Sequence, residues 1–180
     1  QLKIWQQTLS CDELYVSCNL FCNQFFNPSL PEEIEHILTE TALKPESLRV
    51  ELTERALLEN TDIVLSNMKA LKRLGVKILL DDFGTGYSSL SYLHRFPIDV
   101  LKIDKSFINN VHEHQNNRAI IKTIVDLATN LRMATVGEGI ENIEDAQLLQ
   151  KMECLYGQGY YFAKPMDAIT MEQYILKNNA

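Results

Sequence analysis

The chain has 180 residues, of which 46% are hydrophobic and 23% are charged, a composition typical of one globular domain. Asp and Glu total 24 against 17 for Lys and Arg, which gives a net charge of −7. This balance argues against a protein that coats a nucleic acid polymer, because there is no surplus of positive charge to displace counterions. It permits a small anionic ligand that is held through a metal ion.

The sequence contains no membrane segment that we can identify. No apolar stretch reaches the roughly 18–20 residues that a membrane-spanning helix needs, and residues 1–7 do not resemble a signal peptide. The four cysteines, at positions 11, 18, 22 and 154, lack zinc-binding spacing and are interpreted as reduced thiols. These features predict a cytoplasmic location. The histidines at 36, 94, 112 and 114 are interpreted as surface residues.

Strand and helix patterns alternate along the chain after a helix-like opening at residues 2–9. Short apolar runs predict six buried strands: Leu14–Asn19, Leu48–Thr53, Val76–Asp82, Val100–Asp104, Met133–Glu138 and Leu155–Phe162. Helical patterns cover residues 31–41, 61–74, 88–95, 118–131 and 143–152, the last two capped by Asn117 and Asn142. This alternation predicts an α/β fold with a parallel sheet and helical crossovers.

Such a sheet is either an open doubly wound sheet or a TIM-type (β/α)8 barrel. An open dinucleotide-binding sheet would need a glycine-rich phosphate loop after the first strand, and the sequence has none there. Polar residues recur instead at the carboxyl ends of several strands, where a barrel gathers its active site. Because a barrel has eight strands and ~250 residues, the sequence predicts an incomplete barrel of about six strands with the first two missing.

Carboxylates lie at the ends of four successive predicted strands. They are Glu51, Asp81, Asp82, Asp104 and Glu138. Acidic groups gathered at one rim repel one another, and a cation relieves this repulsion. Their hard oxygen atoms select Mg²⁺, Mn²⁺ or Ca²⁺. Lys102 lies inside the fourth strand and belongs either to this site or to a structural ion pair. The pattern indicates two-metal hydrolysis of a phosphoester.

Four segments in fixed order carry a family resemblance. They are DDFGTGYSSL at 81–90, LKIDKSF at 101–107, GEGIE at 137–141 and QGYYF at 158–162. Together they resemble the EAL family of bacterial phosphodiesterases, which hydrolyse cyclic di-GMP (c-di-GMP) to linear pGpG. The resemblance runs from about residue 2 to residue 174. It implies a (β/α)8 barrel whose first strand is antiparallel.

The resemblance also implies residue roles. The metal ligands for two ions of Mg²⁺ or Mn²⁺ would be Asn19, Glu51, Asp81, Asp82 and Glu138, with Asp81 bridging both ions. The catalytic residues would be Lys102, which holds the attacking water, and Glu138, a candidate base. Residues that support the site and the substrate would be Glu54, Asp104, Glu141 and Gln158. A loop of Phe83, Gly84, Thr85, Gly86, Tyr87, Ser88 and Ser89 would link the site to a homodimer interface formed with adjoining helices.

The chain also departs from the family pattern. Phe21 and Arg55 stand where small residues are usual, and Gly137 stands where alanine is usual. The signature Glu-Ala-Leu, followed by a substrate-binding arginine, is expected on a strand before residue 1. We therefore expect residues 1–180 to form a single EAL domain that lacks its N-terminal portion and is weakly active or inactive by itself. Two alternatives stay open: a non-catalytic c-di-GMP receptor and a dimerising signalling module.

Overall fold

A computed structural model describes residues 1–59, 61–85 and 93–178. Its strands form one sheet in the order β1-β2-β3-β4-β5-β6, and all neighbours pair in parallel. The strands are β1 (Val16–Asn19), β2 (Leu48–Thr53), β3 (Lys77–Phe83), β4 (Val100–Ile103), β5 (Ala134–Gly137) and β6 (Tyr156–Gly157). Strand order that follows chain order in a curved parallel sheet is barrel connectivity. The predicted incomplete (β/α)8 barrel is confirmed.

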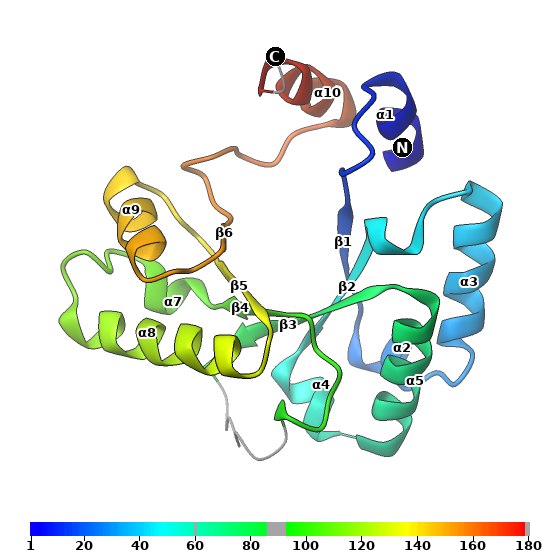
Figure 1. Ribbon diagram of the computed structural model, residues 1–180, viewed down its shortest axis with the longest axis horizontal. Coiled ribbons are helices and arrows are strands. Elements are labelled where there is room, and N and C mark those ends of the chain that lie inside the picture. The colour runs from blue at the N-terminus through cyan, green and yellow to red at the C-terminus, as the bar shows by residue number, and fades with distance from the viewer. Residues whose placement is uncertain (60, 86–92, 179–180) are drawn as a thin grey trace.

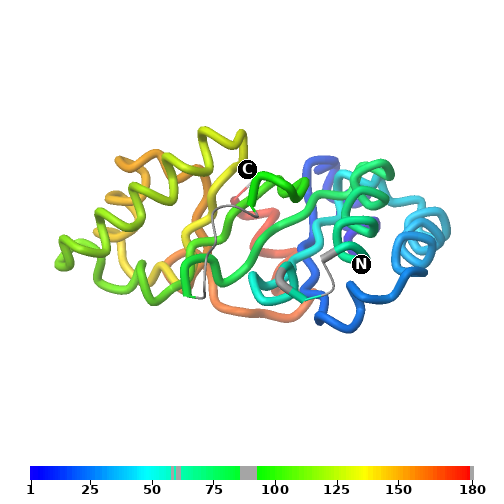
Figure 2. The backbone as a smooth tube through the Cα atoms, turned by 90° about the horizontal axis from the view of Figure 1, so that it is seen from below, coloured from blue at the N-terminus to red at the C-terminus, as the bar shows by residue number. Residues whose placement is uncertain are grey.

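The helices lie in groups around this sheet. They are α1 (Leu2–Thr8), α2 (Cys22–Phe25), α3 (Leu30–Thr41), α4 (Glu54–Leu58), α5 (Thr61–Leu74), α7 (Lys105–Ile108), α8 (Gln115–Asn130), α9 (Ile143–Lys151) and α10 (Ala168–Asn178), with a 3₁₀ turn, η1, at Pro45–Ser47. Helices α2 to α5 cover one flank and α7 to α9 the other (Figure 1). Figure 2 shows these two groups at opposite ends of the molecule, with the strands between them. Among the helices of the described ranges, none is both long and apolar enough to span a bilayer.

The side of the sheet between β1 and β6 is open. In the part of the chain that the structure describes, β1 and β6 are the two edge strands. Helices α1 and α10 lie side by side above this opening (Figure 1), and both line one groove beside β1. The curved sheet therefore has a concave side that remains accessible from this direction.

Alternation along each strand separates two apolar regions. In β3, Ile78 and Leu80 are fully buried in the main core against the helices, whereas Leu79 is not part of that core. Leu79 packs instead with Val100 and Val136, in a small cluster on the concave side. This cluster forms an apolar floor below the carboxyl ends of the strands.

Helix α5 shows why the predicted helices form. Val64, Met68 and Leu71 recur at helical spacing, and all three are fully buried on the face that packs against the sheet. The helix ends before Gly75, whose φ of +100° lies in the left-handed region that glycine tolerates. The bounds of this helix agree with the sequence prediction.

Two differences from the predicted boundaries have a clear physical reason. Helix α8 begins at Gln115, so Asn117 lies inside the helix and does not cap it. The turns before the helix end at His114, an extended residue directly after which the first helical turn begins. Strand β6 has only two residues, because Gly159 lies against the backbone of Ile140 and Phe162 N donates to Gly159 O at 3.1 Å. The chain therefore turns away from the sheet soon after Gly157.

Candidate active site

Lys102 occupies the centre of an acidic cluster at the carboxyl ends of the strands. Its residue is only 4% exposed, and its Nζ lies 2.9 Å from Asp81 Oδ1 and 2.8 Å from Glu138 Oε1. It also donates to a carboxylate oxygen of Glu51. Burial by itself lowers the pKa of an ammonium, but the hydrogen bonds to these three carboxylates outweigh that effect and raise the pKa of Lys102. The ammonium therefore stays charged.

Strand register explains this convergence. In the pairing of β2 with β3, Glu51 is the register partner of Leu79, which precedes Asp81 by two residues. In the pairing of β4 with β5, Lys102 is the register partner of Val136, which precedes Glu138 by two residues. Because residues two apart on a strand point to the same face, all four side chains reach the concave side at nearly the same height. The sequence pattern alone had placed them on separate strands.

Asp82 joins the cluster through an irregularity in β3. Consecutive strand residues ordinarily point to opposite faces. Here the register with β4 shifts between Leu80 and Phe83, and Asp82 has a φ of +54°. As a result, carboxylate oxygens of Asp81, Asp82 and Glu138 all lie within 4.8 Å of one another.

The electrostatics of these acids fit a divalent cation. Burial, followed by the charges of Asp81 and Asp104, raises the pKa of Asp82. Burial also raises the pKa of Glu138, and the hydrogen bond from Lys102 only partly opposes this. The charges of neighbouring acids contribute to both shifts, so one ammonium does not offset all of the carboxylates. Three carboxylate oxygens at this spacing suit a hard divalent ion.

The predicted supporting residues line a pocket beside this cluster. The pocket has a volume of about 440 Å³, and its walls include Asp82, Asp104, Glu138, Glu141 and Gln158. Tyr160 and Lys105 also contribute to it. The structure thus brings three of the four predicted supporting residues into one pocket with two of the predicted metal ligands.

Asn19 and Glu54 lie near the site on the β1–β2 side. Asn19 ends β1, is exposed, and is the register partner of Glu51. Glu54 begins α4 directly after β2. Their roles, like the role of each site residue, stay predictions.

The predicted loop is described only at its start. Phe83 is buried at the end of β3, Gly84 has a φ of +98°, and the Thr85 hydroxyl donates to Asp82 O at 2.9 Å. Gly86, Tyr87, Ser88 and Ser89 lie outside the described residues, as does most of the helix predicted at 88–95. The proposed link from this loop to a dimer interface therefore stays a prediction.

His112 is a residue that the sequence analysis missed. Its side chain is 33% exposed, and its Nδ1 lies 2.7 Å from an oxygen of Asp145, a residue that is 1% exposed. His112 is therefore partly exposed, and the sequence analysis left its contact with Asp145 unpredicted. The only signal in the sequence is Asp145 itself, which follows the helix cap Asn142 by three residues and so faces back toward the helix start.

The incomplete barrel and its acidic rim define a barrel domain with an acidic site at the carboxyl ends of its strands. The family model described as "EAL domain" matches residues 1–165. The chain therefore belongs to the EAL domain family.

Relatives with known names and structures agree with this assignment. "Cyclic di-GMP phosphodiesterase NbdA" of Pseudomonas aeruginosa is 36% identical over 164 residues, which cover 91% of this chain and 21% of that protein. The structure of the PaMucR phosphodiesterase in a c-di-GMP complex superposes with a TM-score of 0.88 at 34% identity, covering 94% of this chain and 68% of that one. A manganese and c-di-GMP complex of Klebsiella pneumoniae BlrP1 superposes with a TM-score of 0.81 at 29% identity. This match covers 91% of this chain and 42% of that one. The chain spans about a fifth of the length of the curated relatives it matches.

Proposed function

We propose that the chain is a phosphodiesterase domain that hydrolyses c-di-GMP to linear pGpG. The observation that carries this proposal is the cluster in which oxygens of Asp81, Asp82 and Glu138 gather beside the buried Lys102. The complexes of PaMucR with c-di-GMP and of BlrP1 with manganese and c-di-GMP support the choice of ligand. The function proposed is that of the domain, as part of second-messenger signalling.

Two ions of Mg²⁺ or Mn²⁺ are part of this proposal. Asp81, Asp82 and Glu138 would hold ions on one side of Lys102, and Glu51 and Asn19 would contribute from β2 and β1. When bound, such ions would polarise a phosphodiester and lower the pKa of water. The acid oxygens fit this task because hard cations prefer carboxylate and amide oxygens.

The side chains of this chain have their own proposed tasks. Lys102 keeps a fixed positive charge at the centre of the acidic cluster. Its three N–H donors contact Glu51, Asp81 and Glu138, so an attacking water would be held by a donor that exchanges one of these contacts for the water. Glu138 is the candidate base that accepts a proton from that water. Asp104, Glu141 and Gln158 line the adjoining pocket and can accept hydrogen bonds from the N–H groups of a guanine base.

Turnover with a matched pair of variants tests the proposal. The chain is incubated with c-di-GMP and Mn²⁺ or Mg²⁺, and pGpG is measured by liquid chromatography. Asp81→Asn should lower the rate by roughly 100-fold, since loss of a residue that only orients a metal ligand already lowers metal affinity or activity 10–100-fold. Asp126→Asn removes an acid that is paired with Lys122 on the surface, and it should leave the rate unchanged. Equal rates in the two variants would contradict the proposal.

We also propose that these 180 residues by themselves turn over c-di-GMP weakly. In the described part of the chain, no strand covers the outer edges of β1 and β6, so substrate bound at the rim is enclosed on one side only. A receptor would bind c-di-GMP tightly without hydrolysis, so calorimetry alongside the turnover assay separates the two functions. Full turnover by this chain, at the rate of a complete EAL domain, would contradict weak activity.

The predicted homodimer is a further part of the proposal. The start of its loop, at Phe83 to Thr85, directly follows the metal-ligand candidates in β3. Sedimentation analysis with and without c-di-GMP tests it. A monomer at micromolar concentration under both conditions would contradict it.

A further inference from the structure

Two segments in contact with each other line the site pocket. The first follows β4 and contains Asp104 and Lys105. The second follows β5 and comprises Glu138–Glu141, which we call the acidic arm. The acidic arm carries one candidate ligand and one candidate substrate contact, so its position determines the shape of the site.

The start of the acidic arm is fixed by the backbone. Glu138 N donates to Ile103 O at 3.1 Å, and Ile140 N donates to Gln158 O at 3.1 Å. Gly139 passes so close to α7 that a Cβ added to it would lie 2.5 Å from Cβ of Lys105. The arm is therefore packed directly against the segment after β4 at this end.

The other end of the arm is fixed by His112. The chain enters α9 at Asn142, whose Oδ1 accepts from Asp145 N at 2.8 Å. The buried Asp145 carboxylate accepts from Asn142 Nδ2 at 2.8 Å, from His112 N at 3.2 Å and from His112 Nδ1 at 2.7 Å. Since His112 lies in the connection between α7 and α8, this contact ties that connection to the first turn of α9.

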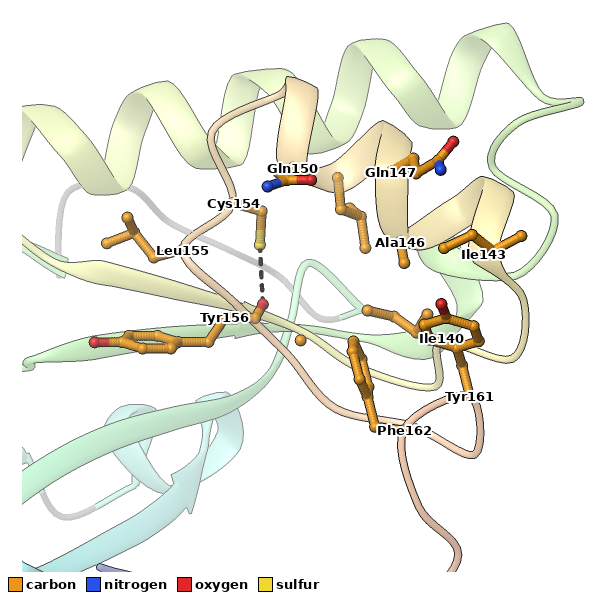
Figure 3. Close-up of a pocket in the computed structure, with 12 residues that line it drawn as sticks. Ile140, Ile143, Ala146, Gln147, Gln150, Cys154, Leu155, Tyr156, Tyr161 and Phe162 are labelled. Atoms are coloured by element: carbon orange, nitrogen blue, oxygen red, sulfur yellow. Dashed lines mark hydrogen bonds between the residues drawn. The ribbon is translucent and has the colours of Figure 1, made fainter. Parts of the chain in front are cut away.

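The rest of α9 is less firmly held on one flank. An apolar groove of about 460 Å³ runs between α9 and the segment after β6. Figure 3 shows Ile143 and Ala146 on one side of this groove and Phe162 on the facing segment. Among the described residues no side chain fills the groove, and Ile143 is 41% exposed. The attachment of the first turn is therefore important for the position of the helix.

We propose that His112 is a positioning residue for the active site, which through Asp145 and Asn142 holds the acidic arm in the geometry that binds a divalent ion. The proposal rests on the proposed function, because it assigns the arm a ligand. Asn142 directly follows Glu141, so a shift of the first turn of α9 moves the arm with it. Metal binding is sensitive to such shifts, because loss of a residue that orients a metal ligand typically lowers the metal affinity 10–100-fold.

The charges around His112 favour its hydrogen bond with Asp145. The hydrogen bond to Asp145 raises the pKa of the His112 imidazole, and the charges of Glu113 and Glu144 add to this. On the α8 side, Arg118 Nε donates to Val111 O at 3.0 Å, which fixes the backbone just before the imidazole. Acids thus face His112 from its own segment and from α9, and the Arg118 guanidinium is engaged with a carbonyl.

Three variants of the 180-residue chain test the proposal. His112→Ala removes the donor to Asp145, whereas His112→Asn keeps an N–H donor at the position of Nδ1. His114→Ala changes an exposed neighbour and is the matched control. We expect calorimetry to give an Mn²⁺ affinity about tenfold weaker for His112→Ala. The affinities of His112→Asn and His114→Ala should stay within about twofold of the unaltered chain.

Amide exchange measured by mass spectrometry provides the structural readout. Exchange across residues 138–145 should be faster in His112→Ala than in the other variants. Unchanged Mn²⁺ affinity in His112→Ala, with strong binding by the unaltered chain, would overturn the positioning role even if exchange were faster. No Mn²⁺ binding by the unaltered chain would overturn the proposed function and this role together, so the two failures are distinguishable.

Discussion

The ammonium of Lys102 in β4 lies 2.9 Å from a carboxylate oxygen of Asp81 in the neighbouring strand β3. The same ammonium contacts acids from β2 and from the segment after β5. A single buried cation therefore links side chains that are far apart in sequence. It also occupies the space between acids that we propose as metal ligands, so the charges of lysine and metal act on the same carboxylates.

Replacement of Lys102 by Met should destabilise the fold. Met removes the charge at similar volume and leaves the buried carboxylate of Glu51, a residue 5% exposed, without its partner. Breaking a buried ion pair on one side costs about 3–5 kcal/mol. Urea denaturation should show this loss, and Mn²⁺ should restore part of the stability because it supplies positive charge to the same acids. Lys122→Met, at an exposed pair, is the control and should change stability little.

Replacement of Asp82 by Asn should separate metal binding from folding. Asp82 has a φ of +54°, a conformation that Asn adopts at least as readily as Asp, so the fold should be retained. The loss of one carboxylate should weaken Mn²⁺ binding by at least about tenfold. Thermal denaturation with and without Mn²⁺ measures both effects. A variant that Mn²⁺ stabilises as strongly as the unaltered chain would remove Asp82 from the ligand set.

Much of the fold could be predicted from the sequence because its signals are local. β2, for example, alternates apolar Leu48, Val50 and Leu52 with polar residues, and its observed bounds, Leu48–Thr53, match the prediction. The failures occur where distant contacts decide the structure. β6 ends early because Gly159 packs against the backbone of Ile140, a contact that no local pattern encodes.

The same distinction applies to the site. Glu51, Asp81 and Glu138 could be identified because each lies at the end of a strand in a parallel sheet. That Lys102 contacts all three depends on the strand register, which the sequence does not display. His112 was missed because its partner, Asp145, is 33 residues away on helix α9.

Replacement of Gly139 by Ala should disturb the acidic arm. The residue has a φ of +68°, and an added Cβ would lie 2.5 Å from Cβ of Lys105. Overpacking of this kind costs about 1–3 kcal/mol, and a left-handed backbone disfavours Ala further. Urea denaturation should show the loss, and calorimetry should show weaker Mn²⁺ binding.

Gly137→Ala is the matched control for Gly139→Ala. Gly137 has no positive φ, and its added Cβ would meet the end of the flexible Leu149 side chain at 2.8 Å. Leu149 can move to relieve this contact, so the cost should be clearly smaller. An equal loss of stability in both variants would show that the backbone conformation of Gly139 is not what matters.

The contribution of the His112–Asp145 pair to stability should depend on pH in a defined direction. The hydrogen bond to Asp145 raises the pKa of His112 above its ordinary 6.5, so its contribution is complete below pH 6.5 and is lost as pH rises through the raised value. Burial opposes ionisation of Asp145, but hydrogen bonds from His112 and Asn142 outweigh it and lower the pKa of this acid below its ordinary 3.8. Its contribution is therefore present above pH 3.8 and is lost as pH falls through the lowered value.

Urea denaturation of the unaltered chain and of His112→Ala between pH 4 and pH 9 measures this effect. The difference in free energy of unfolding should be largest between the two ordinary pKa values, 3.8 and 6.5, where both groups are charged. It should shrink at higher pH without vanishing, because a neutral imidazole can still donate from Nδ1 to Asp145. His114→Ala should show no such trend, since its side chain is exposed. A difference that stays constant or grows as the pH rises would mean that the charge of His112 does not strengthen its contact with Asp145.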